Sequence, residues 1–353
     1  MSDRPTLVLV GGFLGAGKTT LLIRAARLLL ERGLRAAIIT NDQAGALVDT
    51  RMAAASGFDT TEVAGACFCC RFGDFIAAAK SLLAIQPDVI FAEPVGSCMD
   101  LSATVLQPLK ELHATEFRLA PYTVLIDPQQ AEGFEDPLLN YLYQNQINEA
   151  DLVVYTKSDL NPQPPAPSPK PRREGAARRL SALTGQGVGA WLDEVLNGRL
   201  RAGTHLLDID YARYAAAEAS LGWLNWEAEL KFAAALPPAA VVGPLLEDLD
   251  AELTAASVPI AHLKIFDRTP GSYIRAGICR NGGEPSVEGD LLATPARHHE
   301  LIVNLRAHAV PAVLDEVMAR TTRAIPGKLR VRHHQSFQPS PPVPTYRYDK
   351  ASP

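Results

Sequence analysis

A glycine-rich segment near the N-terminus has the residues and spacing of a phosphate-binding loop. It reads Gly12-Phe-Leu-Gly-Ala-Gly-Lys-Thr-Thr20, satisfies Gly-x4-Gly-Lys-Ser/Thr, follows an apolar run typical of a strand and precedes a helical pattern. The glycines let backbone N–H groups face phosphate oxygens, and the start of the following helix adds a favourable dipole. Lys18 is expected to neutralise the β- and γ-phosphates, and the Thr19 hydroxyl to bind Mg²⁺. The residues expected to contact the nucleotide here are Gly12, Gly15, Ala16, Gly17, Lys18, Thr19 and Thr20.

A second short motif, Thr156-Lys-Ser-Asp159, follows a later apolar run and indicates which base is bound. An Asp carboxylate can accept hydrogen bonds from both N1–H and the 2-amino group of guanine, a pair that adenine does not offer. The usual first residue of this motif is Asn, and Thr is a weaker match. The sequence therefore predicts GTP or GDP as the nucleotide. The residues expected near the base are Thr156, Lys157 and Asp159, with Ser181 and Ala182 supplying a backbone loop.

Acidic residues at the ends of two further apolar runs are candidates for catalysis and magnesium binding. Glu93 begins Glu93-Pro-Val-Gly96, where Glu93 could orient water or bind Mg²⁺ through water, and the Gly96 N–H could donate to the γ-phosphate. Asp42 is the candidate magnesium carboxylate at the end of another run, directly or through water. Asp127 could equally supply that carboxylate, and it ranks lower because it lies farther along the sheet. The predicted catalytic set is Lys18, Glu93 and Gly96.

Three thiols within four residues form a candidate metal site. Cys67, Cys69 and Cys70 can converge on one soft or borderline ion, with Zn²⁺ the default and Co²⁺, Cu(I) or Ni²⁺ the alternatives. Three protein ligands leave one coordination position open, which suits transfer of the ion better than permanent structural binding. Cys98 or Glu62 could add a fourth ligand, although a lone Cys beside a turn is more often simply packed. Alternatively, the three cysteines could simply be buried and packed like small hydrophobic residues, without binding a metal.

Composition narrows the class of protein. A chain of 353 residues with 47% hydrophobic and 21% charged residues suits two folded domains. A net charge of −5 argues against a nucleic acid as the main partner, because such a protein would need a basic face. No run approaches the length of a membrane span, and no leader precedes the first strand, so a cytoplasmic protein is expected. Five cysteines, an odd number and clustered, do not resemble a disulfide framework.

Alternating strand and helix patterns predict an α/β fold of the P-loop NTPase type, with mostly parallel strands and helices on both faces. We expect this domain to span residues 1–205, with a Pro-rich insertion at 161–173. Residues 206–338 predict a smaller α+β domain of ferredoxin-like type, followed by an extended tail at 339–353. The strands expected in the first domain are 7–10, 36–40, 89–92, 123–126 and 152–155.

In their order, these motifs resemble those of the CobW-like P-loop GTPases, which are related to the nickel-insertion GTPases of urease and hydrogenase maturation. The resemblance implies a GTP-hydrolysing metallochaperone for a transition metal, often zinc or cobalt. It would hold the ion at the Cys-x-Cys-Cys motif and deliver it to a client metalloprotein or a cofactor pathway such as cobalamin biosynthesis. GTP would favour the holding state and hydrolysis would release the ion, which requires a metal affinity that differs between nucleotide states.

The sequence also departs from this family and leaves two other interpretations open. Ala66 stands where the family usually has Gly, and the switch begins with Asn41-Asp instead of Asn-Glu. The long His-rich tract of many members is missing. The chain could instead be a GTP-dependent regulatory switch with structural or redox cysteines, or a small-molecule kinase, which the guanine motif disfavours. Intrinsic turnover should be slow, since the sequence places no arginine finger. Homodimers are common among these relatives, although no residue here demonstrates one.

Overall fold

The structure is a computed structural model that describes residues 4–43, 48, 52–53, 56–130, 134–160 and 178–352, and it does not describe the side chains of Asp42 and Gln129. The Pro-rich insertion expected at 161–173 lies outside these residues. Contacts divide the chain into two compact units. Unit 1 comprises Met1–Gln43, Asp49–Ala217 and Pro341–Pro353, and unit 2 comprises Ala44–Val48 and Glu218–Ser340. Among the described helices, none combines the length and apolar character that crossing a membrane requires.

Unit 1 is built on a parallel sheet with the strand order β3-β2-β4-β1-β6-β7-β8, and β5 pairs with β1 outside this path. Its central strands are buried along their whole length and consist mostly of apolar residues, as expected for strands covered on both faces. The predicted fold class is confirmed. The strands are β1 (Thr6–Gly12), β2 (Ala36–Asp42), β3 (Asp59–Ala64), β4 (Val89–Glu93), β5 (Arg118–Leu119), β6 (Thr123–Ile126), β7 (Leu152–Tyr155) and β8 (Arg178–Arg179).

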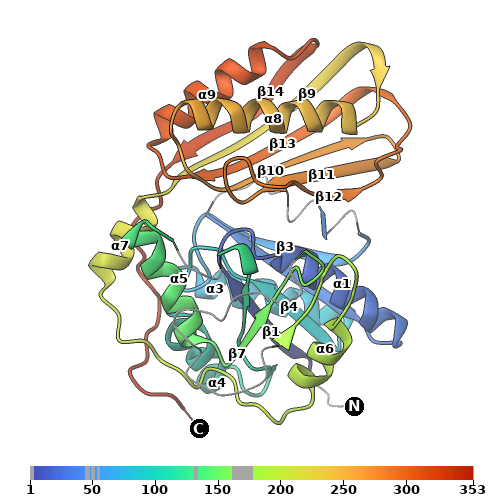
Figure 1. Cartoon of the computed structure of the whole chain (residues 1–353). Coiled ribbons are helices and arrows are strands. Elements are labelled where there is room, and N and C mark those ends of the chain that lie inside the picture. Colours follow the sequence, from blue (N-terminus) through green and yellow to red (C-terminus); the bar gives the residue numbers. More distant parts are fainter. Residues whose placement is uncertain are drawn as a thin grey trace. The chain divides into compact units, whose positions relative to one another are not determined.

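Helices cover both faces of this sheet (Figure 1). Helices α1 and α6 contact each other on one face, and α3, α4 and α5 lie on the other. These helices keep water from the faces of the sheet. Polar side chains that bind ligands are therefore expected at the ends of the strands. The helical elements are α1 (Lys18–Glu31), α3 (Phe72–Leu82), η1 (Leu83–Ile85), the π-helical η2 (Ser102–Leu106), α4 (Gln107–Leu112), η3 (Pro128–Gln130), α5 (Pro137–Glu149), α6 (Val188–Leu196) and α7 (Tyr211–Ala219).

The register of the sheet brings the predicted site residues to one edge. Glu93 at the end of β4 is paired with Thr40 of β2, and Leu9 of β1 is paired with Ala92 of β4. On the other side of β1, the last residue of β6, Ile126, is opposite Tyr155 of β7. Because the strands are parallel, the loops that follow them meet at their carboxyl ends, where open α/β sheets bind ligands.

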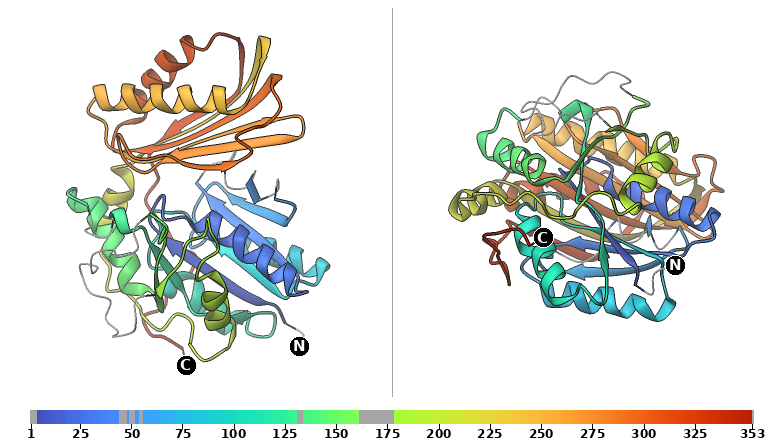
Figure 2. Two further views of the ribbon diagram at one scale, coloured as in Figure 1. Left: turned by 45° about the vertical axis from the view of Figure 1, so that its right-hand side comes forward. Right: turned by 90° about the horizontal axis from the view of Figure 1, so that it is seen from below.

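Unit 2 is a separate antiparallel sheet with two helices. When β11 and β12 are left aside, the strands lie in the spatial order β14-β9-β13-β10. Helix α8 follows β9 and helix α9 follows β13 along the chain, which gives the ferredoxin-like arrangement. Helices α8 and α9 lie on the same face and bury their apolar residues against the sheet (Figures 1 and 2). The elements are β9 (Gly222–Leu236), α8 (Ala239–Ala255), β10 (Ile260–Thr269), β11 (Ser272–Ile278), β12 (Ser286–Gly289), β13 (Ala296–Ala307), α9 (Pro311–Arg323) and β14 (Lys328–Phe337).

Candidate functional site

The glycine-rich loop connects β1 to α1 as the sequence predicts. Gly17 at the start of α1 has φ +90°, a left-handed conformation that glycine adopts without strain. Gly12 has φ +133°, and a Cβ atom there would lie 2.6 Å from the Leu125 carbonyl oxygen. The Lys18 ammonium lies 3.0 Å from the Gly12 carbonyl oxygen and 3.4 Å from that of Phe13. Lys18 is therefore folded over its own loop, where it can reach a phosphate oxygen.

Two residues predicted separately from the sequence meet beside this loop. The Thr19 hydroxyl donates a hydrogen bond to Glu93 Oε1 at 3.1 Å, and Lys18 Nζ lies 4.0 Å from the same oxygen. All three side chains are buried. Hydroxyl and carboxylate oxygens are ligands that Mg²⁺ prefers, so the donor set fits this ion. Asp42, the other predicted magnesium ligand, ends β2 at this edge, and its side chain lies outside the described part of the chain.

Gly96 packs directly against the phosphate-binding loop. A Cβ atom at Gly96 would lie 2.8 Å from Leu14 Cδ2 and 3.2 Å from Leu14 Cα, so a larger residue would push the loop away. The Gly96 carbonyl accepts a hydrogen bond from Gln146 Nε2 at 2.9 Å. On the other side, Gln130 Nε2 donates to the Leu14 carbonyl at 3.2 Å. The backbone of Gly96 is thus held next to the loop that would carry the phosphates.

The predicted base-binding segments lie together after β7. Thr156 Oγ1 donates to the Ala16 carbonyl at 2.9 Å, which ties the end of β7 to the phosphate-binding loop. The backbone N–H of Ser158 donates to the Leu180 carbonyl at 3.2 Å, so the Thr156–Asp159 segment adjoins the loop that begins at Ser181. Ser181 is buried and its hydroxyl accepts the Thr184 N–H at 3.1 Å. Asp159 is exposed at the edge of this pair of loops.

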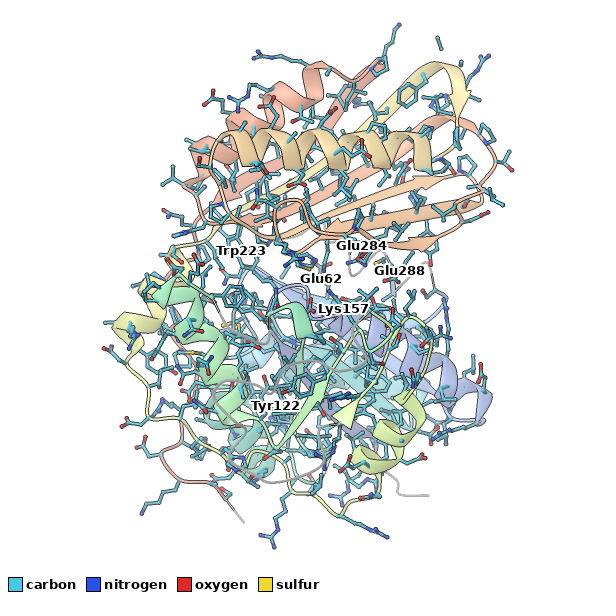
Figure 3. All side chains as sticks on the ribbon, viewed as in Figure 1. Glu62, Tyr122, Lys157, Trp223, Glu284 and Glu288 are labelled. Atoms are coloured by element: carbon cyan, nitrogen blue, oxygen red, sulfur yellow. The ribbon has the colours of Figure 1, made fainter. Side chains whose placement is uncertain are left out.

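Lys157 binds Asp127, the alternative candidate for the magnesium carboxylate. Lys157, labelled in Figure 3, has φ +52° and directs its ammonium group to Asp127 Oδ2 at 2.6 Å. The Asp127 side chain is fully buried, and the Lys157 side chain is 23% exposed. The Asp127 carboxylate is therefore already engaged by a cation.

The three clustered thiols converge. The distance from Cys67 Sγ to Cys70 Sγ is 3.3 Å, that from Cys69 Sγ to Cys70 Sγ is 3.7 Å, and all three atoms lie within 4.8 Å of one another. Tetrahedral zinc with Zn–S bonds of ~2.3 Å requires sulfur atoms ~3.8 Å apart, close to what is observed. Cys67 and Cys69 are buried and Cys70 is partly exposed. The cluster fits a soft or borderline metal ion.

The three thiols of the cluster differ in pKa. Hydrogen bonds from Cys69 and then from Cys70 and Cys98 hold the pKa of Cys67 well below its usual range. The hydrogen bond to Cys67 raises the pKa of Cys70 to about 12, and the same partner raises the pKa of Cys69 well above its usual range. One thiolate is thus stabilised by neighbouring thiols that keep their protons. A bound cation would displace those protons, since metal ligands must be deprotonated.

Comparison with known proteins relates part of the chain to a described family. Residues 6–170 match the family model described as CobW/HypB/UreG, nucleotide-binding domain. Unit 1 contains a CobW/HypB/UreG nucleotide-binding domain. The chain is also similar to the zinc chaperone YeiR of Escherichia coli (strain K12), with 32% identity over 161 residues that cover 43% of the chain. The alignment spans 46%, about half, of that relative's length.

Two solved structures are also similar to the chain. HypB from Helicobacter pylori in complex with nickel is 18% identical, with 55% of this chain and 87% of that chain covered and a TM-score of 0.41. Zn(II)-bound YjiA GTPase from E. coli is 14% identical, with 92% of this chain and 100% of that chain covered and a TM-score of 0.32.

In the CobW/HypB/UreG domain, the thiol loop is fastened to the sheet by Asn41. Asn41 Nδ2 donates to the carbonyl oxygens of Val63 at 2.7 Å and Ala66 at 2.8 Å, and Asn41 Oδ1 accepts the Phe68 N–H at 2.9 Å. Sequence reasoning considered Asn41 only as the neighbour of Asp42. The available signal was its position as a polar residue at the end of a buried strand, where a side-chain amide can bind the backbone of the next loop.

A segment from the other end of the chain also contacts this loop. We call residues 343–352 the C-terminal strap. The Val343 N–H donates to Cys70 Sγ at 3.3 Å, and Thr345 bonds to the carbonyl oxygens of Cys69, through its N–H at 2.9 Å, and Cys70, through its hydroxyl at 3.2 Å. The Tyr346 ring packs edge-on against Phe72, with 5.4 Å between ring centroids. The strap therefore covers part of the thiol cluster.

An ion pair anchors the strap to the CobW/HypB/UreG domain. Arg347 Nε lies 2.9 Å from Asp100 Oδ2, which also accepts the Tyr211 hydroxyl at 2.8 Å. Asp100 is buried, and burial raises the pKa of its carboxyl against the lowering effects of Tyr211 and Arg347. Farther along, the Ser352 N–H donates to Gln107 Oε1 at 2.7 Å. No local sequence pattern links 343–352 to residues so distant in the chain.

Proposed function

We propose that this protein is a GTP-hydrolysing metallochaperone that binds Zn²⁺ or Co²⁺ at Cys67, Cys69 and Cys70 and delivers it to a client metalloprotein or cofactor-synthesis enzyme. The observation that carries the proposal is the convergence of the three thiols in a loop tied through Asn41 to the end of β2. The same sheet edge carries the phosphate-binding loop and Glu93. The zinc chaperone name of the E. coli relative supports the choice of cargo.

Each nucleotide contact follows from chemistry already described. Lys18 and the loop N–H groups neutralise the phosphates, Thr19 and Asp42 hold Mg²⁺, and Asp159 selects guanine. Glu93 orients the attacking water, and the Gly96 N–H donates to the γ-phosphate, so GTP and water become GDP and phosphate. Hydrolysis is slow in the isolated chain. When GTP is bound, the Glu93–Gly96 segment takes one position, and after loss of the γ-phosphate it takes another.

The thiol cluster suits a cargo ion better than a resident one. Structural zinc sites normally fill all four positions with protein ligands, whereas these three mutually close thiols leave room for a donor from the client. Partial exposure of Cys70 gives that donor a side from which to approach. Metal and nucleotide affinities must influence each other equally, because the coupling between two sites is reciprocal.

The test is a competition titration of Zn²⁺ and Co²⁺ with GDP and with a non-hydrolysable GTP analogue. We compare the wild type, a Cys67/Cys69/Cys70→Ser variant, and Cys279→Ser, which changes a thiol in unit 2. We expect one ion per chain with nucleotide-dependent affinity in the wild type and in Cys279→Ser, and loss of tight binding in the triple variant. Equal metal binding by the triple variant, or affinity indifferent to nucleotide, would contradict the proposal.

One observation favours a second candidate, a GTP-dependent switch with redox-active cysteines. The Sγ atoms of Cys67 and Cys70 are 3.3 Å apart, and the pKa of Cys67 is lowered by its thiol neighbours, which favours a reactive thiolate. A peroxide, reduced to water, could take two electrons from this pair as the two thiols form a disulfide. Thiol counts before and after mild peroxide, with and without bound Zn²⁺, separate the two candidates. Protection by one equivalent of Zn²⁺ favours the metallochaperone.

A further inference from the structure

The sheet of unit 2 carries a pocket in which positive charge exceeds negative charge. Its volume is about 700 Å³, and sites for small molecules usually measure ~300–1,000 Å³. Among the described residues that line it, the Lys and Arg side chains outnumber the carboxylates, and we call it the basic pocket. The charged residues are Lys231, Arg268, Lys328, Arg330, Glu229 and Glu300. An anion is therefore the kind of ligand that complements this pocket.

Three basic residues lie side by side across the strands of the pocket. Lys231 of β9 is opposite Lys328 of β14 on one side and opposite His298 of β13 on the other. All three residues are exposed, and we call them the basic row. Within the part of the chain that the structure describes, their side chains have no ion-pair or hydrogen-bond partner. Like charges directly opposite each other destabilise a sheet, so an anion bound across the row would stabilise it.

The two carboxylates of the pocket are already paired with arginines. Glu229 is opposite Arg330, and Arg330 Nη1 lies 3.8 Å from Glu229 Oε2. Glu300 is opposite Arg268, whose Nε donates to Glu300 Oε2 at 2.9 Å. These carboxylates therefore offset the charge of the arginines and leave that of the basic row uncompensated.

A buried His–Asp pair fixes the backbone next to the basic row. His299 Nδ1 lies 2.7 Å from Asp267 Oδ2, and both side chains are fully buried. His299 Nε2 lies 3.0 Å from the Ala296 carbonyl oxygen. The ring thus fastens β13 to β10 and spans the irregular pairing of β13 with β9 between Ala296 and His298. A backbone held in this way is organised before a ligand binds, which lowers the cost of binding.

We propose that the basic pocket binds a small molecule that carries two or more phosphate groups. Adjacent strands are ~4.8 Å apart, so the basic row extends over ~10 Å, and a ligand that contacts all of it needs more than one anionic group. A phosphate group carries up to about two negative charges at neutral pH, and lysine binds it as a point charge. The described lining includes no Phe, Tyr or Trp ring on which a nucleobase could stack. This site belongs to unit 2 and goes beyond the proposed function, whose residues lie in unit 1.

Calorimetric titration of the full-length protein with tripolyphosphate tests the proposal. The nucleotide site is first filled with a non-hydrolysable GTP analogue, so that the phosphate-binding loop cannot take the probe. Lys231→Gln/Lys328→Gln removes two charges of the basic row. The matched control, Arg280→Gln/Arg323→Gln, removes two exposed cations of unit 2 that lie outside the pocket. We expect one tripolyphosphate per chain in the wild type and the control, and affinity weaker by ~10-fold or more in the lysine variant.

Orthophosphate and citrate test the chemical class of the ligand. Orthophosphate should bind ~10-fold or more weakly than tripolyphosphate, because one phosphate group reaches only part of the basic row. Tighter binding of citrate than of tripolyphosphate would overturn the phosphate class.

Three results of the titration would overturn the site itself. They are no binding of tripolyphosphate by the wild type, equal affinity in the wild type and the lysine variant, and an equal loss of affinity in the arginine control, which would indicate attraction by net charge alone. Melting temperatures of the variants confirm that each is folded. Because no metal takes part, failure of the metallochaperone proposal leaves this test unaffected.

Discussion

Asn41 Oδ1 accepts a hydrogen bond from the Phe68 N–H at 2.9 Å, joining the end of β2 to the middle of the thiol loop. Since both polar atoms of the Asn41 side chain bind backbone groups of β3 and the thiol loop, we expect Asn41 to position the metal ligands. Asn41→Ala should lower Zn²⁺ affinity by ~10–100-fold, the range seen when groups that orient metal ligands are removed. GTP affinity should change little.

The measurement is a competition titration for Zn²⁺ with a fluorescent nucleotide assay on the same samples. Asn145→Ala is the matched control, since Asn145 Nδ2 also binds a carbonyl oxygen, that of Tyr141 on α5. Wild-type Zn²⁺ affinity in Asn41→Ala would show that the loop keeps its shape without this side chain.

Glu93 should matter for hydrolysis more than for binding. Glu93→Gln preserves the size of the side chain and an oxygen that can accept from Thr19, but it removes the negative charge. We expect hydrolysis to slow by ~100-fold or more, the lower end of the usual contribution of a positioned acid or base. Phosphate release in a single turnover measures the rate. The exposed Glu135→Gln variant serves as control, and equal rates in the two variants would remove Glu93 from catalysis.

The C-terminal strap should shield Cys70, and Arg347 should hold it in place. Arg347→Ala removes the partner of the buried Asp100 carboxylate, which makes the strap contacts less stable. We expect faster alkylation of Cys70 and a lower melting temperature. Asp349→Ala breaks another Arg347 contact, of 2.8 Å, but Asp349 is largely exposed and should have little effect. Mass spectrometry of alkylated peptides gives the rates, and equal rates in all three proteins would refute the shielding role.

Glu149 should make unit 1 less stable as the pH rises. Burial, and then repulsion from Asp100, raises the pKa of Glu149 well above its usual range, although its Oε2 accepts the Ser102 N–H at 3.1 Å. The folded state thus holds the proton more tightly than the unfolded chain. The resulting stability is fully present below the unfolded pKa of about 4.3 and is lost as the pH rises through the folded pKa.

Glu149→Gln removes this loss, because an amide carries no charge at any pH. Relative to the wild type, its melting temperature should therefore rise more at pH 8 than at pH 5. Scanning calorimetry at both values tests the prediction, with the exposed Glu31→Gln on α1 as control. A difference between Glu149→Gln and the wild type that is the same at both pH values would contradict it.

Local patterns were enough to predict the central sheet. The residues of β1, β4 and β6 are buried along their whole length and mostly apolar, which marks strands covered on both faces. Strand β3 was missed because its sequence, Asp59-Thr-Thr-Glu-Val-Ala64, is largely polar. As an edge strand it is only partly buried, so it carries no continuous apolar signal.

The sequence alone determined which functional groups are present: a phosphate-binding loop, a guanine motif, a carboxylate at Glu93 and three neighbouring thiols. Each of these is recognised from residue types at short spacing. Only the tertiary structure decided which distant groups meet them. The bonds of Asn41 to the thiol loop and the strap over Cys70 join residues from separate segments. Such contacts depend on how the elements pack, and no local pattern records that.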